Sequence, residues 1–201
     1  MSGLRSCREL RELELYENCV CCIEGLDGLV KLATLDLSYN RIQRMEGLGA
    51  AGLPSLRELY LANNRISAIE GLEGLDRLEV LELGSNQLRR IGNLRHLGAL
   101  RELHLGRNDI DLIGEGLAGL ASLRTLGLAS NRLRSLQGVE AAVGLRELYA
   151  DHNMIDDTAP ILGLSQLHTV ELSANRLRSI QVAPLSLLDV EANEADEAEP
   201  A

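Results

Sequence analysis

The sequence is nearly devoid of aromatic side chains, with four Tyr and neither Trp nor Phe among its 201 residues. A compact globular core usually contains some of these large rings, whereas a solenoid builds a narrow core from stacked aliphatic rows. Aliphatic residues are not scarce, because hydrophobic residues make up 45% of the chain and leucine is the commonest of them. This imbalance favours a solenoid over a globule.

Long apolar runs and an excess of positive charge are also missing. No run approaches the length of about 20 residues that spans a membrane, and the opening MSGLRSCREL lacks the apolar segment of a signal peptide. Asp and Glu outnumber Lys and Arg by 30 to 20, a net charge of −10. This balance disfavours direct contact with nucleic acid or a membrane and favours a protein partner with a basic or mixed surface. We expect a protein of the nucleus or cytoplasm.

The cysteines are confined to the beginning of the chain. They are Cys7, Cys19, Cys21 and Cys22. Cys19 and Cys22 have the C-x-x-C spacing of zinc ligands, but no second pair of ligands follows downstream. Extracellular repeat proteins usually carry Cys-rich caps at both ends, and the C-terminal end has none. Ordinary reduced thiols are therefore favoured, with a zinc site and a disulfide as alternatives.

A motif of about 22 residues recurs along the whole chain. In Leu78 to Leu97 it reads LEVLELGSNQLRRIGNLRHL, or L-x-x-L-x-L-x-x-N-x-(L/I) followed by apolar residues at every third position. Its Asn stands at positions 18, 40, 64, 86, 108, 131, 153 and 175. Two insertions, in GLGAAGLPSL and LIGEGLAGLASL, fall in the second half of a repeat. Because one such unit cannot bury its apolar face alone, the repeats must stack.

The motif predicts the shape of each turn of the coil. Alternation in L-x-L indicates a short strand, and stacked turns make these strands parallel neighbours in one sheet. The three-residue spacing of the second half indicates 3-10 or irregular turns. The Asn amide, which is both donor and acceptor, is expected to form a ladder inside the coil. The sequence therefore predicts a curved right-handed solenoid, with the strands on its concave face and the turns on its convex face.

Three regions follow from this assignment. Residues 1–9 form a short N-terminal segment in which Leu4 and Cys7 are expected to pack as the remnant of a turn. Residues 10–193 form the array of eight repeats and a partial ninth. Residues 194–201, EADEAEPA, are acidic and are predicted to be disordered.

The third, fifth and seventh residues of each repeat are predicted to point into the concave space. The candidate partner-binding residues are Asp36, Tyr60, Glu82, His104, Tyr149, Glu171 and Asp189 at the fifth position, and Glu58, Glu102 and Glu147 at the third. Rings among carboxylates are typical of binding hot spots. The alternative is a solvated face that only keeps the protein soluble. A face that only keeps the protein soluble would mix positive and negative charges. Here the arginines are kept apart from the acidic positions, because they follow the Asn of the repeat at Arg41, Arg65, Arg132 and Arg176.

No arrangement of residues typical of an enzyme is visible. The four His residues fall in different repeats, at positions 96, 104, 152 and 168. Asp151, His152 and Asn153 are adjacent, but Asn153 is assigned to the ladder. Neither a Ser with an activating His nor a Gly-rich phosphate loop is present, and Gly25, Gly47, Gly71 and Gly138 recur at one position of the repeat, as bends would. We predict a protein that is not an enzyme and needs no cofactor or metal.

The segment after the Asn carries a resemblance to a known family. It reads I-E-G-L or M-E-G-L at residues 23–26, 45–48 and 69–72. With LEVLELGSNQLRRI, LRELHLGRNDI and LRELYADHNMI, the chain resembles the 22-residue leucine-rich-repeat family, and in it the group of protein phosphatase 1 regulatory subunit 7, from about Leu10 to Asn193. The resemblance implies an α/β leucine-rich-repeat solenoid that binds the phosphatase catalytic subunit through acidic and aromatic residues of its concave face. The matching positions are Asp36, Tyr60, Glu82, His104, Glu171 and Asp189, although the family favours an aromatic ring where His104 stands.

Two other interpretations remain open at this point. The same repeat occurs in general adaptors of ciliary or axonemal complexes and of nuclear RNA–protein complexes, where the partner would be a helix or a basic peptide. A shortened relative without a stable partner would instead expose apolar ends and self-associate. As a phosphatase regulator or an adaptor, the protein itself is expected to be monomeric.

Overall fold

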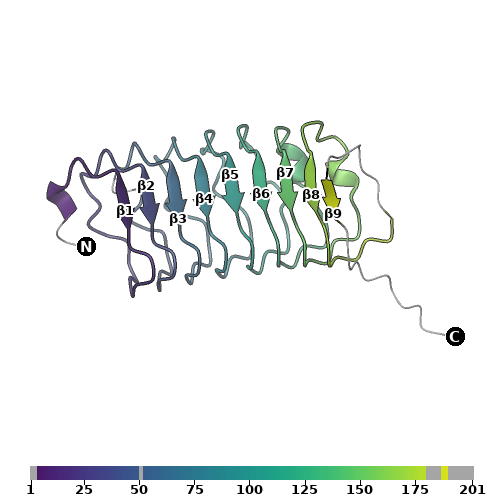
Figure 1. The fold of residues 1–201 in the computed structure, drawn as a ribbon, viewed down its shortest axis with the longest axis horizontal. Coiled ribbons are helices and arrows are strands. Elements are labelled where there is room, and N and C mark those ends of the chain that lie inside the picture. The colour runs from purple at the N-terminus through teal and green to yellow at the C-terminus, as the bar shows by residue number, and fades with distance from the viewer. Residues whose placement is uncertain (1–3, 50–51, 180–186, 190–201) are drawn as a thin grey trace.

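Nine short parallel strands form one sheet whose order follows the sequence (Figure 1). The computed structural model describes residues 4–49, 52–179 and 187–189. The strands are β1 (Glu12–Glu14), β2 (Thr34–Asp36), β3 (Glu58–Tyr60), β4 (Val80–Glu82), β5 (Glu102–His104), β6 (Thr125–Gly127), β7 (Glu147–Tyr149), β8 (Thr169–Glu171) and β9 (Leu187–Asp189). Each is contributed by one repeat, so the predicted parallel-strand solenoid is confirmed.

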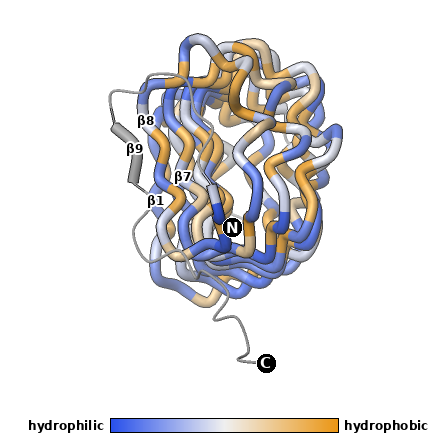
Figure 2. Tube along the Cα trace, turned by 90° about the vertical axis from the view of Figure 1, so that its right-hand side faces the viewer, coloured by the Kyte–Doolittle hydropathy of each residue, from blue (hydrophilic) through white to orange (hydrophobic). Residues whose placement is uncertain are grey.

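The chain returns from each strand to the next through tight turns on the opposite side of the coil (Figure 2). Their backbone N–H groups donate to the carbonyl three residues earlier, as from Leu29 to Leu26 (3.2 Å) and from Leu32 to Leu29 (3.0 Å). This is the 3-10 pattern that the three-residue spacing predicts. Two of these turns form short 3-10 helices in the described part of the chain, η2 (Val139–Ala141) and η3 (Ala159–Ile161), and a further one, η1 (Leu4–Ser6), precedes β1. In the described ranges no helix has the length and apolarity to cross a membrane.

The strand register is the same along the whole array. The central residues of neighbouring strands pair with each other, including Leu35 with Leu59 and Leu103 with Leu126 across the two insertions. The insertions therefore leave the register intact, as predicted. In β9 the same register continues, with Leu188 opposite Val170. The ladder position Asn193 and the predicted tail, residues 194–201, lie outside the described residues.

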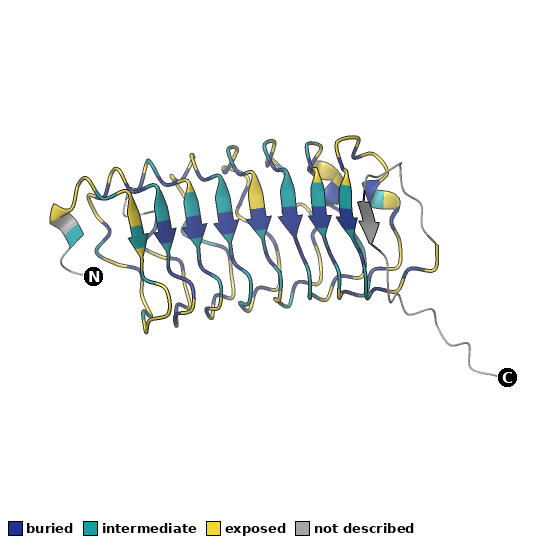
Figure 3. Ribbon diagram, viewed as in Figure 1, coloured by how far each residue is buried: buried dark blue, intermediate teal, exposed yellow. Residues whose placement is uncertain are grey.

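The core is a stack of aliphatic rows between the sheet and the turns. The central residue of every strand from β2 to β8 is fully buried, while the first residue of each is half-buried or exposed (Figure 3). The first coil differs, because Leu10, Leu13 and Leu15 are only partly buried and β1 is the first strand of the sheet. Leu4 packs against this end as expected, but Cys7 is exposed, contrary to the expectation that it packs there.

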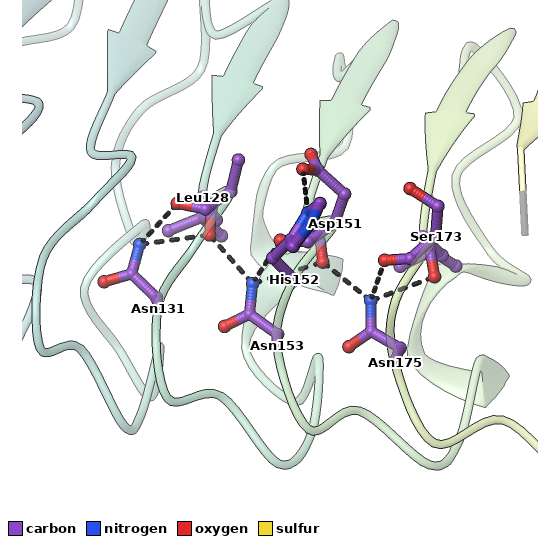
Figure 4. Close-up of polar contacts among 10 residues, drawn as sticks. Leu128, Asn131, Asp151, His152, Asn153, Ser173 and Asn175 are labelled. Carbon is purple, nitrogen blue, oxygen red and sulfur yellow. Dashed lines mark hydrogen bonds and ion pairs between the residues drawn. The ribbon is translucent and has the colours of Figure 1, made fainter. Parts of the chain in front are cut away.

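Asparagines that are buried or half-buried inside the coil join each coil to the one before it. The Asn108 amide donates from Nδ2 to the carbonyl of Leu83 (3.0 Å), and its Oδ1 accepts the N–H of Leu88 (3.0 Å). The same two contacts, at 2.8 to 3.0 Å, recur at Asn40, Asn64, Asn86, Asn131, Asn153 and Asn175. Figure 4 shows three consecutive members. The predicted ladder is confirmed. Its role is to provide hydrogen-bond partners for backbone N–H and C=O groups that have none in the sheet.

The residue before each ladder Asn has a left-handed backbone, which the sequence analysis did not anticipate. Its φ lies between 52° and 56° in all eight repeats. The residues are Glu17, Tyr39, Asn63, Ser85, Arg107, Ser130, His152 and Ala174. None of them is glycine, although a left-handed conformation costs an ordinary residue about 1–2 kcal/mol. The backbone N–H of seven of these residues donates to a carbonyl of the next coil, as from Glu17 to Ser38 (3.0 Å) and from Arg107 to Ala129 (2.8 Å), and these bonds hold the chain in this conformation.

The ladder predicts a difference in stability between two asparagines. We expect Asn108→Ala to lower the free energy of unfolding by about 3 kcal/mol, because it leaves buried backbone donors and acceptors without partners. Asn18→Ala is the control, since the described contacts of the Asn18 side chain reach only Leu15 and Tyr16 of its own coil. Its loss should stay below about 1 kcal/mol. Urea denaturation measures both, and equal losses would contradict the cross-coil role.

The glycine of the I-E-G-L segment lies against the preceding coil. Gly47 has a φ of +99°, and a Cβ on it would overlap the carbonyl oxygen of Ile23. Gly74 also has a positive φ, +82°, but a Cβ there would meet nothing within 4 Å. The prediction that Gly25, Gly47, Gly71 and Gly138 form bends is confirmed by their positive φ angles.

These two glycines form a matched pair for mutation. We expect Gly74→Ala to cost about 1–2 kcal/mol, the price of a left-handed backbone alone. Gly47→Ala should cost clearly more, because the two coils must also move apart. The comparison is made by thermal and urea unfolding of both variants. Equal losses would show that coil contact at Gly47 contributes nothing.

Candidate partner-binding face

The outward side of the sheet, here called the sheet face, is built from two rows of side chains. The first row comes from the first residue of each strand: Glu12, Thr34, Glu58, Val80, Glu102, Thr125, Glu147 and Thr169. The second row comes from the third residue: Glu14, Asp36, Tyr60, Glu82, His104, Gly127, Tyr149 and Glu171. Because side chains alternate along a strand, these two positions point away from the leucine core. This is the surface predicted to be concave.

The predicted binding residues come together on this face. Asp36, Tyr60, Glu82, His104, Tyr149 and Glu171 lie in the second row, and Glu58, Glu102 and Glu147 lie in the first. Asp189 belongs to β9, whose side chains are outside the described residues. Strand pairing aligns each row, because Tyr60, Glu82 and His104 are opposite one another on β3, β4 and β5. That these residues bind a partner stays a prediction.

Negative charge dominates the sheet face. Of the sixteen residues in the two rows of β1 to β8, eight are Asp or Glu and none is Lys or Arg. Adjacent strands are about 4.8 Å apart, so neighbouring carboxylates lie within the screening distance of about 10 Å in 0.1 M salt. The face can therefore attract and orient a positively charged surface.

Two carboxylates of the first row, those of Glu58 and Glu147, are held by hydroxyl groups. Glu58 Oε2 accepts from Tyr60 Oη (3.2 Å) and from Thr34 Oγ1 on the neighbouring strand (3.4 Å). Glu147 repeats this arrangement with Tyr149 Oη (3.2 Å) and Thr125 Oγ1 (3.3 Å). Burial, and then the charge of the adjacent Glu, raises the pKa of each tyrosine. Both phenols therefore remain protonated donors.

Two carboxylates of the second row, those of Asp36 and Glu82, accept from the backbone instead. Asp36 Oδ1 accepts the N–H of Ser38 (2.8 Å), and Glu82 Oε1 accepts the N–H of Gly84 (2.5 Å). Burial raises the pKa of Glu82, while the Gly84 N–H and the nearby His104 act in the opposite direction. Glu82 is thus an acid that the fold keeps partly desolvated on an otherwise open surface.

A column of arginines directly before the strands was missed by the sequence analysis, which noted only those that follow the Asn. It consists of Arg11, Arg57, Arg101, Arg124 and Arg146. Glu79 forms ion pairs with both Arg57 and Arg101, the latter at 3.6 Å. Arg124 donates to the carbonyls of Leu123 and Gly144, both at 3.0 Å. The sequence signal for this basic border is Arg as the second residue of the repeat, just ahead of the strand, in five of the first eight repeats.

An exposed tyrosine pair lies beyond the ends of β1 and β2. The rings of Tyr16 and Tyr39 are 4.9 Å apart between centroids and tilted by 52°. Both side chains are about half exposed, at 48% and 47%. Tyr39 was missed because it occupies the left-handed position, whose direction cannot be read from strand alternation. The pair adds an aromatic corner to the acidic sheet face.

Other candidates for chemistry do not assemble into a site. Cys7, Cys19, Cys21 and Cys22 are all free and exposed, and the described residues contain no group of three metal-binding side chains. Cys21 and Cys22 line a pocket of about 430 Å³ between the first two coils, away from the sheet face. His152 Nδ1 lies 2.9 Å from Asp151 Oδ2 (Figure 4), but Asn153 beside them is bonded into the ladder.

Comparisons with known proteins agree with this architecture. Residues 31–88 and 54–110 match the family described as leucine rich repeat. Internalin C2 from Listeria monocytogenes is 28% identical, with a TM-score of 0.83 over 91% of this chain and 81% of its own. A leucine-rich-repeat protein of Leptospira interrogans is 27% identical, with a TM-score of 0.86 over 96% of this chain and 52% of its own. No curated protein matches this chain.

A third solved structure is a complex of TLR13 with ssRNA13. TLR13 is 26% identical, with a TM-score of 0.80 over 90% of this chain and 27% of its own. Together with the matched repeats, these structures show that the chain folds as a leucine-rich-repeat solenoid. Proteins of this fold typically present an extended surface to other proteins rather than catalyse a reaction.

The raised pKa of Glu82 predicts a specific pH dependence. Because the folded state holds this proton more tightly than the unfolded state, the contribution of Glu82 to stability is fully present below the ordinary pKa of Glu and is lost as the pH rises through the raised value. Glu82→Gln removes this titration, so the variant should gain stability over the wild type as pH rises from about 4 to 8. Urea midpoints at several pH values measure the difference. Parallel profiles for the two proteins would contradict it.

Proposed function

We propose that this protein is a non-catalytic scaffold that binds a protein partner through the sheet face. The observation that carries the proposal is the absence of Lys and Arg from sixteen face residues of which eight are acidic. Tyr60 and Tyr149 add rings whose hydroxyls are already bonded, so little side-chain freedom is lost on binding. A positively charged segment of another protein fits this surface best.

The more specific proposal names the catalytic subunit of protein phosphatase 1 as the partner. Its support is the sequence resemblance to regulatory subunit 7, carried by the segments at residues 23–26, 45–48 and 69–72. The acidic and aromatic positions matched by that resemblance all lie on the sheet face where side chains are described. A nuclear or cytoplasmic location is part of the same proposal.

RNA is a weaker candidate than a protein. The TLR13 structure contains ssRNA13, but a nucleic acid is held mainly through its phosphates, which need Lys and Arg. The two described rows of the sheet face supply none of these residues and eight carboxylates. We therefore do not extend RNA binding to this chain.

Capture of the purified phosphatase catalytic subunit by the immobilised protein tests the proposal. We expect Glu82→Lys to weaken binding at least about tenfold, because it places a cation where the partner's positive surface docks and costs about 1.4 kcal/mol or more. Tyr60→Ala should also weaken binding. Glu73→Lys, an exposed change in a back turn, serves as the control with equal charge and should bind as the wild type does.

Two outcomes would contradict the proposal in different ways. If the catalytic subunit binds the wild type and both face variants equally, the sheet face is not the contact surface. If it does not bind the wild type at all, the phosphatase assignment is wrong. Salt-sensitive binding of basic peptides would then still support a scaffold of the adaptor kind.

A further inference from the structure

The sheet face repeats every two coils, not every coil. The tetrapeptide Leu-Arg-Glu-Leu leads into β1, β3, β5 and β7, whereas the even strands begin with Thr or Val. The third residue of β3, β5 and β7 is Tyr60, His104 and Tyr149, each two residues after a first-row Glu. The face therefore carries an acid–ring unit on every second strand, and its three copies are here called the acid–ring subsites.

Each acid–ring subsite leaves one carboxylate oxygen available. Glu58, Glu102 and Glu147 all use Oε2 for the contact with their own ring, at 3.2, 3.4 and 3.2 Å. Among the described residues, no hydrogen bond or ion pair to the other oxygen, Oε1, is present in any of the three. The second-row acids Asp36 and Glu82 each turn one oxygen onto the backbone N–H two residues later, and neither shares its strand with a ring. A carboxylate with an open oxygen beside a ring of its own strand therefore recurs on alternate strands.

The spacing of these acceptors discriminates between kinds of partner. Strands about 4.8 Å apart place the subsites about 9.6 Å apart. A polyproline II segment returns to the same side every three residues, about 9.3 Å. An α-helix returns after seven residues, about 10.5 Å, and an extended strand returns after two, about 6.8 Å. Over three subsites the mismatch is about 0.6 Å for polyproline II and about 1.8 Å for the helix.

We propose that the three acid–ring subsites receive arginines at every third residue of a polyproline II segment of a partner, running across the strands. The inference rests on the proposed function and specifies the form of its partner. Arginine suits the subsites because its planar guanidinium both pairs with a carboxylate and stacks on an aromatic ring. The rings also offer the kind of surface on which Pro-rich segments dock.

Three labelled peptides of equal charge, titrated against the whole protein by fluorescence anisotropy, test this inference. The first has three arginines, each separated from the next by two prolines. The second has the same composition, with its arginines separated by single prolines. The third is an Ala-rich helix with arginines seven residues apart. We expect the first to bind about tenfold more tightly than the second and more tightly than the helix.

A double variant locates the contact. Glu58→Gln with Glu147→Gln removes two charges but keeps acceptors for the tyrosine and threonine hydroxyls, so the face should retain its structure. Each lost exposed ion pair is worth up to about a fivefold change, and the first peptide should fall to the affinity of the second. Glu24→Gln with Glu73→Gln, both exposed in back turns, removes the same charge and should change nothing.

The possible failures are distinct. Equal binding of the first two peptides would overturn the spacing inference while leaving an acidic protein-binding face. Tightest binding by the helix would replace the polyproline II segment with a helical partner. Unchanged binding by the double face variant, or no binding by any peptide, would also overturn the inference. Phosphatase capture would then decide the proposed function separately.

Discussion

The hydrogen bonds between consecutive coils through the buried asparagines are the constraint on which the rest of the structure depends. A strand of three residues gives few ladder bonds, and the chain must leave the sheet immediately afterwards. The Asn amide bonds backbone groups of two coils at this point, as Asn108 does with Leu83 of the preceding coil and Leu105 of its own. The Asn amide therefore determines where each strand ends. The end of the strand in turn determines which side chains point outward from the sheet.

The sheet face follows from that fixed geometry. Since every coil enters and leaves the sheet in the same register, side chains from different repeats fall into straight rows. Rows bring together residues that are 44 or 45 positions apart in the sequence, such as Glu58, Glu102 and Glu147. Threonine and tyrosine hydroxyls then orient two of these carboxylates before any partner arrives. A surface prepared in this way loses less conformational entropy on binding.

Much of this was predictable because the leucine pattern determines both the coil and the direction of each side chain. The strands, the Asn ladder, the back turns and the rows that contain Tyr60, Glu82 and His104 all follow from it. Details that depend on side-chain rotamers did not follow, among them the bonding of Glu82 to the Gly84 N–H and the choice of oxygen at Glu58. The exposed position of Tyr39 was also missed, because β2 ends three residues earlier, at Asp36, and the backbone at Tyr39 is left-handed.

The left-handed column has a consequence for how such a coil can change. Its eight positions hold an acid, a base, two rings, an amide and small residues, yet their φ angles agree within 4°. The conformation is imposed by the neighbouring coil bonds and not by the residue that occupies the position. The column can therefore vary its chemistry while the frame that carries it stays constant. Related coils could therefore change their binding specificity at this column, while the adjacent rows of the sheet face keep their carboxylates.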